Sequence, residues 1–238
     1  MPVGRRTGPR RHWPIAARRS SSCWTWPTGY PAGPPDPWPS LRFPVLLVVT
    51  PELSLADKVV AVHQALTRAE AAHAFGGALA LAYYAEPRAT IDIDVNLFVA
   101  PEARGPIVAA LDALGLTADL RQAERDGQVR VMWGRTPLDL FFSYLPLHEA
   151  MREQVRTVPF GDGAIPILSP EHLLVCKALF NRPKDWLDIE QVAAAATGLN
   201  HVEISRWMRE IVGEADERSV RIGTLLSDGP THGGAGAG

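Results

Sequence analysis

Apolar residues recur at helical spacing in the first half of the chain. After Ser54 they fall at every third or fourth position, and Asp57, three residues past Ser54, completes a capping-box pattern. This pattern predicts a helix over residues 54–72. The same spacing predicts a second helix over residues 101–114, which Gly115 would end.

Shorter stretches alternate apolar and polar residues or are continuously apolar, which is typical of β-strands. The dipeptide Asp126-Gly127 predicts one hairpin turn, and Gly161-Asp162-Gly163 predicts a second. The strands that we expect cover residues 91–99, 117–123, 128–133, 137–142, 155–160 and 164–168.

From Ser169 onward the pattern is helical only. Ser169 is placed as a helix N-cap, with Pro170 at the first helical position. Further helices are expected over residues 185–196, 201–212 and 219–226. The sequence therefore predicts an α+β fold. A short mixed sheet with flanking helices would occupy residues 51–168, and a helical bundle would follow over residues 169–228.

The composition changes abruptly near residue 51. Residues 1–50 hold ten of the 21 prolines, four of the seven tryptophans, and seven arginines against one acid, Asp36. Their formal charge is +6, and the 17 basic and 25 acidic residues that remain give −8. We expect this leader to be disordered, or translation to begin further down, near Val48 or Leu53. A basic arm that touches nucleic acid is the alternative.

The remaining compositional features exclude several classes of protein. Cys23 and Cys176 form no CxxC or Cys/His pattern, so neither a disulfide scaffold nor a cysteine metal site is expected. No stretch approaches the ~20 apolar residues of a membrane span. We expect a cytoplasmic protein that does not enter a membrane, with a flexible glycine-rich tail over residues 229–238.

Three acids and a glycine pair carry the candidate chemistry. Asp92 and Asp94 are two positions apart on a predicted strand, so they face the same side, and Asp139 lies on a later strand. Three carboxylates can hold two Mg²⁺ ions about 3.5–4 Å apart, which activate an attacking oxygen and stabilise a leaving pyrophosphate. Gly76-Gly77 would let the backbone approach a triphosphate at a helix start. The alternatives are a solvated strand edge for the first two acids and a turn cap for the third.

These residues also form a recognisable pattern. Gly76-Gly77 followed by residues 88–94 (RATIDID) resembles the signature of the DNA polymerase β-like nucleotidyltransferase superfamily. Residues 169–177 (SPEHLLVCK) and 182–188 (RPKDWLD) are similar to one branch of it, the AbiEii-type toxins of type IV toxin–antitoxin systems and the related mycobacterial MenT toxins. The matching blocks span about residues 73 to 195.

The resemblance implies transfer of a nucleoside monophosphate from an NTP to an acceptor, with Mg²⁺ or Mn²⁺ as cofactor. It implies that Asp92, Asp94 and Asp139 are metal ligands. It implies that Asp94, Lys177 and Asp185 are catalytic. The residues that it implies for nucleotide binding are Gly76, Gly77, Arg88, Thr90, Lys177, Lys184 and Asp188.

The spacing of residues 177–188 also leads to a prediction without the resemblance. Pro183 makes a continuous helix from Lys177 to Asp188 unfavourable, so we expect these two residues on adjacent helices. There Arg182, Lys184 and the acids would form a charge network. The alternatives are that Lys177 reaches solvent from an apolar helix and that Asp185 and Asp188 cap a helix start.

The expected partners follow from the resemblance and are limited by charge. In the toxin branch the acceptor would be the 3′ end of a tRNA, and a cognate antitoxin would be a partner. The charge of −8 provides no broad basic face, although Arg121, Arg125, Arg130 and Arg135 form a local cluster. Two alternatives remain: a nucleotidyltransferase acting on a small molecule of the antibiotic type or on a protein, and a catalytically inactive module that binds a nucleotide or a partner. The sequence does not specify the oligomeric state.

Overall fold

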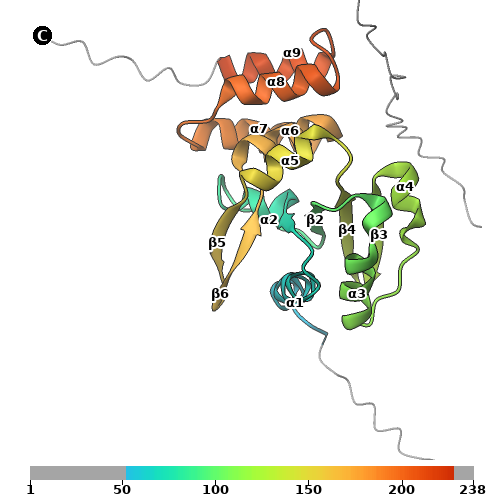
Figure 1. Ribbon diagram of the computed structural model, residues 1–238. Helices are drawn as coiled ribbons and strands as arrows, with labels where there is room; N and C mark the ends of the chain where they lie inside the picture. Colours follow the sequence, from blue (N-terminus) through green and yellow to red (C-terminus); the bar gives the residue numbers. More distant parts are fainter. Residues whose placement is uncertain (1–51, 228–238) are drawn as a thin grey trace, which may run out of the picture. The chain divides into compact units, whose positions relative to one another are not determined.

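The computed structural model describes residues 52–227, so the expectations for residues 1–50 and 229–238 lie outside the described residues. The described strands form a six-stranded mixed sheet in the order β3-β4-β2-β1-β6-β5 (Figure 1). These strands are β1 (His73–Phe75), β2 (Ile93–Leu97), β3 (Gln128–Trp133), β4 (Thr136–Phe142), β5 (Arg156–Phe160) and β6 (Gly163–Ile167). The described helices are α1 (Leu55–Arg68), α2 (Gly77–Leu81), α3 (Gly105–Ala113), α4 (Ala123–Asp126), α5 (Pro146–Glu153), α6 (Pro170–Phe180), α7 (Pro183–Ala195), α8 (His201–Ile211) and α9 (Glu217–Ser227), with short 3₁₀ turns at Pro101–Ala103 and Leu120–Gln122.

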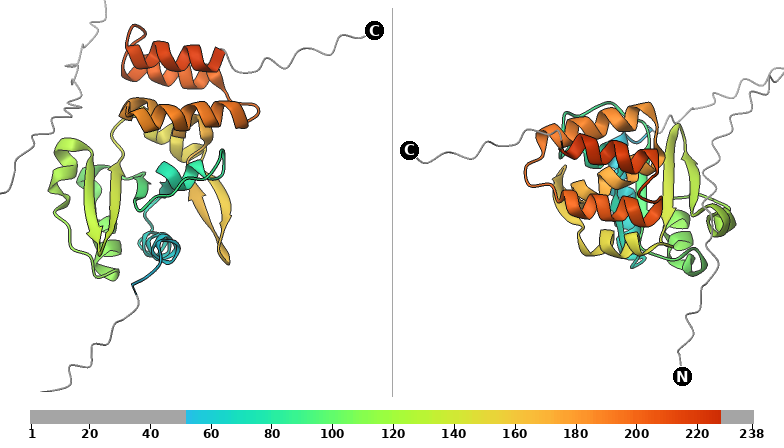
Figure 2. Two further views of the ribbon diagram at one scale, coloured as in Figure 1. Left: turned by 180° about the vertical axis from the view of Figure 1, so that it is seen from behind. Right: turned by 90° about the horizontal axis from the view of Figure 1, so that it is seen from above.

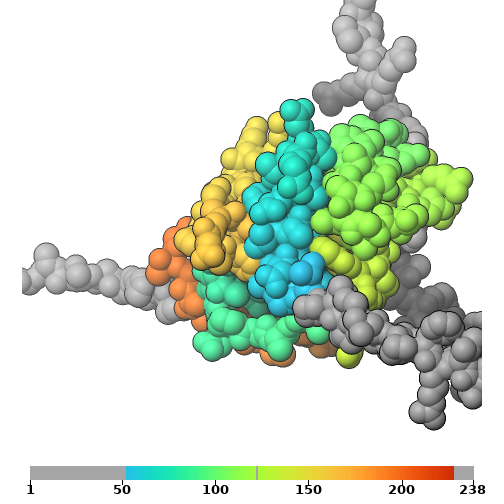
Figure 3. All heavy atoms as spheres, turned by 90° about the horizontal axis from the view of Figure 1, so that it is seen from below, coloured from blue at the N-terminus to red at the C-terminus, as the bar shows by residue number. Residues whose placement is uncertain are grey.

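This arrangement confirms the α+β prediction. In Figure 1 α1 lies below α2 and β2, level with the tip of the β5–β6 hairpin, and α3 lies at the lower end of β3 and β4. Helices α6 to α9 lie above the sheet in two tiers. The view from behind in Figure 2 shows the same tiers, with α8 and α9 outermost. Figure 3, from below, shows α1 between the green residues of α3 and the yellow and orange residues of the β5–β6 hairpin. None of the helices between residues 52 and 227 is long and apolar enough to cross a membrane.

The first helix begins as expected and ends earlier. The Ser54 hydroxyl accepts a hydrogen bond from the Asp57 N–H, and the Asp57 carboxylate accepts one from the Ser54 N–H, which completes the capping box. The helix ends at Arg68 and not near residue 72, because Glu70 adopts a left-handed φ of 53°. The N–H of Ala71 then bonds back to the Leu66 carbonyl, as in a Schellman motif.

The hairpin predicted at Asp126-Gly127 is wrong, as is the strand over residues 117–123. Residues 120–126 form a 3₁₀ turn and α4, and Gly127, with φ of 67°, follows the end of that helix. The hairpin turn lies instead between β3 and β4, at Gly134 with φ of 61°. Glycine occupies both positions because each requires a positive φ, which glycine adopts without a steric penalty.

Other differences concern short or interrupted elements. The helix expected over residues 101–114 is a 3₁₀ turn followed by α3, because Pro106 has no N–H to continue a helical hydrogen-bond ladder. The strand expected over residues 91–99 is shorter, and β1 and α5 were not predicted. The second hairpin, around Gly161-Asp162-Gly163, is confirmed by the β5–β6 pairing.

A buried lysine ties α1 to the β3–β4 hairpin. The Lys58 ammonium donates hydrogen bonds to Glu52 Oε1 at 2.9 Å, to the Trp133 carbonyl at 3.1 Å and to Thr136 Oγ1 at 3.0 Å. All three ammonium donors are therefore satisfied, as a buried charge requires. Because Trp133 and Thr136 close the hairpin turn, Lys58 fixes that turn against α1.

Candidate active site

Two of the predicted acids lie side by side in the sheet. Strands β2 and β4 are parallel neighbours, and their register places Asp94 opposite Asp139. Adjacent strands are about 4.8 Å apart, and residues in register point to the same face of a sheet. The alternate residues, such as Val95 and Leu140, are buried in the hydrophobic core on the other face. The sheet therefore presents the two carboxylates together.

The glycine pair makes room for one of these carboxylates. A Cβ on Gly77, where α2 begins, would lie 1.8 Å from Asp94 Oδ2, and Gly77 has a φ of 55°. A Cβ on Gly76 would lie 2.8 Å from Asn96 Nδ2. The Gly76 N–H also donates to the Asp94 carbonyl at 2.9 Å. The two glycines thus permit the close approach of α2 to Asp94.

The surroundings of Asp94 disfavour its charge. Burial is the largest cause, and the negative charges of Asp139 and Asp92 add to it, while Lys177 and Arg182 act in the opposite direction. Together they raise the pKa of Asp94 to about 6. Among the described residues, the Asp94 carboxylate accepts no hydrogen bond and forms no ion pair.

Asp139, in contrast, is fully engaged. Arg130 lies opposite it in the antiparallel β3–β4 pair and donates from Nε and from Nη2 to the two carboxylate oxygens, each at 2.6 Å. Within residues 52–227 no group of three or more His, Cys, Asp or Glu side chains is placed so that it could hold a metal ion. The donor chemistry suits a hard divalent cation, but the three acids do not form that ligand set in this conformation.

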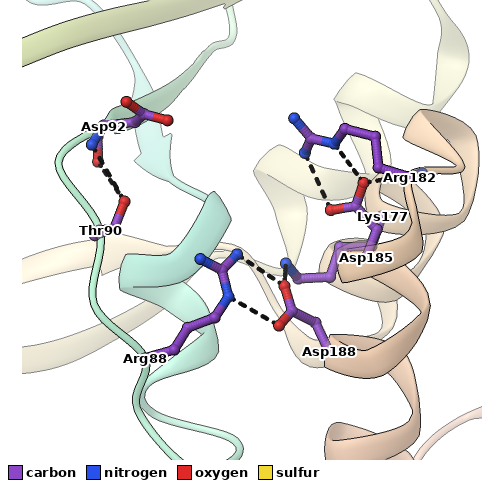
Figure 4. Close-up of polar contacts among 7 residues, drawn as sticks. All are labelled: Arg88, Thr90, Asp92, Lys177, Arg182, Asp185 and Asp188. Atoms are coloured by element: carbon purple, nitrogen blue, oxygen red, sulfur yellow. Dashed lines mark hydrogen bonds and ion pairs between the residues drawn. The ribbon is translucent and has the colours of Figure 1, made fainter.

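Asp92 lies just before β2, on the loop that leads into it. Its N–H donates to Thr90 Oγ1 at 3.2 Å, so the Thr90 hydroxyl is directed to the backbone of this loop (Figure 4). The loop brings Asp92 close enough to Asp94 for their charges to interact. Asp92 thus lies near Asp94, but on the loop before β2 and not, as had been predicted, on the same strand.

A three-residue ion network joins the same loop to the helices. Asp188 on α7 accepts two hydrogen bonds from Arg88, both at 2.9 Å, and one from the Lys177 ammonium on α6 at 2.6 Å (Figure 4). The side chains of Lys177 and Asp188 are only 4% and 3% exposed. Burial alone would raise the pKa of Asp188, but the bonds from Arg88 and Lys177 outweigh it and lower that pKa. As expected, Lys177 and Asp188 are on adjacent helices.

The start of α7 holds the remaining predicted residues. Asp185 is buried and accepts hydrogen bonds from the Arg182 N–H, Nε and Nη2 at 3.2, 2.5 and 3.0 Å. The Arg182 side chain is half exposed, and Lys184 is exposed beside it. The carboxylate of Asp185 thus caps the helix and orients Arg182.

Two arginines also act on the acids. Arg182 was predicted only as part of the charge network with Lys184, and Arg130 was not predicted at the site. Arg130 faces the acids from β3, and the charge of Arg182 acts on Asp94 from the start of α7. The sequence indicated Arg182, because this residue begins the RPKDWLD block. No sequence pattern indicated Arg130, because its position opposite Asp139 depends on the β3–β4 register.

Comparisons with known proteins find only distant similarity. No family model and no curated protein matches the chain. Among solved structures, the chain is similar to the antibiotic-resistance factor ANT(2″)-Ia in solution, with 17% identity and a TM-score of 0.44 over 72% of this chain and 90% of that one. It is similar to ANT(2″)-Ia in complex with adenylyl-2″-tobramycin, with 16% identity and a TM-score of 0.44 over 72% of this chain and 94% of that one. It is also similar to an antigenic nucleotidyltransferase-like protein from Paracoccidioides brasiliensis, with 14% identity and a TM-score of 0.39 over 73% of this chain and 93% of that one. These similarities are too distant to assign a function. The function is therefore inferred from the side chains of the site itself.

Proposed function

We propose that this protein is a nucleotidyltransferase, which transfers a nucleoside monophosphate from an NTP to a hydroxyl group of an acceptor. The observation that carries the proposal is the pair Asp94 and Asp139 on neighbouring parallel strands, with the Asp94 carboxylate seated against Gly77 and left without a partner among the described residues. A charged acid that is largely removed from water is costly unless a counter-charge or a bound metal ion compensates it. Two acids side by side raise that cost.

In the proposed reaction the acceptor oxygen forms a bond to the α-phosphorus of the NTP. The bond from that phosphorus to the oxygen bridging to the β-phosphorus breaks, and pyrophosphate leaves. Asp94 takes the proton of the acceptor hydroxyl, which is the role of a general base. Mg²⁺ or Mn²⁺, held by Asp92, Asp94 and Asp139 when bound, would supply positive charge to the phosphate oxygens.

Cations around the acids support a triphosphate as the donor. Arg182, the N-cap residue of α7, acts on Asp94, and Lys184 is exposed in the first turn, where the helix dipole also favours an anion. Lys177 and Asp188 are predicted to bind the nucleotide, and here they form a buried ion pair. In our proposal this pair and Arg88 position the Thr90–Asp92 loop beside α7. Asp185 orients Arg182 toward the phosphates.

The acceptor is a finer part of the proposal. Residues 169–177 and 182–188 resemble the toxin branch, which supports the 3′ end of a tRNA as the acceptor and a cognate antitoxin as a partner. Binding of RNA requires positive charge, but here Arg121 is paired with Asp119 and Arg104 with Glu124. The charge distribution therefore supports other acceptors equally. A small hydroxylated molecule or a protein therefore belongs in the same test.

The test is transfer of label from NTPs carrying a radioactive α-phosphate by the full-length protein, with Mg²⁺ or Mn²⁺. tRNA, aminoglycoside or lincosamide antibiotics, and total protein are supplied in separate reactions. We expect one acceptor class to become labelled with release of pyrophosphate, and Asp94→Asn to lower the rate at least about 100-fold. Asp162→Asn, which removes an exposed acid in the β5–β6 turn, is the matched control and should transfer at the wild-type rate. Binding of NTP without transfer to any acceptor would identify a binding module and overturn the proposal.

A further inference from the structure

Arg130 is the cation that faces all three acids of the site. It makes two parallel hydrogen bonds to Asp139, and the charges of Asp92 and Asp94 also act on it. A guanidinium matches the geometry of a carboxylate in this way and leaves neither oxygen free for another cation in the same plane. One side chain therefore engages both carboxylate oxygens of Asp139.

The two partners differ in their freedom to move. The Arg130 side chain is 57% exposed, and that of Asp139 is 15% exposed. On β3 the neighbours Val129 and Val131 are buried in the core, so the strand is anchored while the arginine extends toward solvent. An ion pair with one exposed partner exchanges readily when a stronger charge arrives. Arg130 can thus leave Asp139 by side-chain rotation, without moving the sheet.

A triphosphate brings such a charge. It offers several anionic oxygens, and arginine binds phosphate in the same two-bond geometry in which it binds a carboxylate. Once Arg130 turns to the phosphates, both oxygens of Asp139 face Asp94 and Asp92 with no counter-charge between them. The site then attracts a divalent cation, which the nucleotide-free state repels through Arg130.

We propose that Arg130 is a built-in cation that blocks the metal site until the triphosphate of an incoming nucleotide draws it away from Asp139. This inference rests on the proposed function and deepens it, because it names the regulation of the same site. Nucleotide and metal should then bind cooperatively, with a coupling carried by one residue.

The experiment measures Mn²⁺ binding to the full-length protein by the electron paramagnetic resonance signal of free Mn²⁺. It is done with and without an NTP analogue that has a methylene group between the α- and β-phosphorus and cannot transfer its monophosphate. In the wild-type protein we expect the analogue to tighten Mn²⁺ binding about tenfold or more. Arg130→Gln should bind Mn²⁺ about tenfold more tightly than wild type without the analogue, and the analogue should then add little.

Two further single variants and one double variant distinguish this gate, the displacement of Arg130, from a simple change of charge. Arg121→Gln removes an arginine from a similar two-bond pair with the exposed Asp119, and it should leave Mn²⁺ binding unchanged. Arg130→Lys keeps the charge but not the two parallel bonds, and it should fall between wild type and Arg130→Gln. In Arg130→Gln with Asp139→Asn the gain in Mn²⁺ affinity should disappear.

Unchanged or weaker Mn²⁺ binding in both Arg130 variants, with the analogue effect preserved, would overturn the gate. That outcome leaves the proposed function intact if Asp94→Asn still abolishes transfer. The converse is also distinguishable. If no acceptor is labelled but Arg130→Gln tightens Mn²⁺ binding, the gate stands and only the transfer reaction is lost.

Discussion

Replacing Asp188 by Asn tests the ion network that joins the Thr90–Asp92 loop to the helices. The substitution leaves the buried Lys177 ammonium, only 4% exposed, without the carboxylate that lies 2.6 Å away. Removing one partner of a buried pair typically costs about 3–5 kcal/mol, because the other charge stays buried without compensation. Arg88 is more exposed and can turn to water, so Lys177 accounts for most of that cost.

The assay is urea unfolding of the full-length protein, supported by thermal melts. At about 2–4 °C per kcal/mol for a chain of this size, the expected loss is roughly 6–20 °C in Tm. Replacing Lys177 by Met in the Asp188→Asn protein should restore most of the stability, because it removes the stranded charge. As a matched control, Asp216→Asn removes a carboxylate from the more exposed pair with Arg218 and should cost about 1 kcal/mol or less.

Two results would refute this account of the network. One is a decrease below 1 kcal/mol in the unfolding free energy of Asp188→Asn, since the Lys177 ammonium would then be hydrogen-bonded to water or to another group. The other is a double variant no more stable than Asp188→Asn, since the cost would then come from packing and not from the charge on Lys177.

Two further predictions concern the glycine pair and the response to acid. Gly77→Ala should lower the transfer rate at least tenfold and destabilise the protein, because its Cβ would overlap Asp94 Oδ2. Gly161 has nearly the same φ, 56°, but open space around it, so Gly161→Ala is the control. In urea unfolding it should lose only the backbone cost of about 1–2 kcal/mol. Equal losses of unfolding free energy in the two variants would contradict the overlap. Burial lowers the pKa of His148 from 6.5 to about 4, so the unfolded chain binds its proton first and stability falls as the pH drops from 6.5 toward 4. At pH 5 the loss from this residue is about 2 kcal/mol. His148→Gln should show a smaller difference in unfolding free energy between pH 7.5 and pH 5, and an unchanged difference would argue against the buried neutral histidine.

The sequence was most informative where one signal has one structural meaning. Ser54 and Ser169 cap helices because their hydroxyls accept N–H groups at a helix start, and both were predicted. The alternation around Asp94 placed it on a strand with its side chain away from the core. Such local signals were enough for the α+β class and for most helices.

The sequence failed where a position depends on distant parts of the chain. With a turn at Asp126-Gly127, β3 would have paired with residues 117–123, and no pattern in the sequence placed Arg130 opposite Asp139. The actual turn at Gly134 puts Arg130 opposite Asp139. Strand register is a property of the paired strands, so the role of Arg130 could be found only in the structure.

The anchoring of Lys58 has a consequence for choosing where a recombinant chain should start. A version that begins at Leu53 would contain every strand and helix of the domain, yet it would lack Glu52, the only carboxylate among the described residues that contacts the Lys58 ammonium. That ammonium holds the hairpin on which Arg130 and Asp139 face each other. A cloning boundary one residue too late would thus weaken the geometry of a site that lies more than 70 positions downstream in sequence.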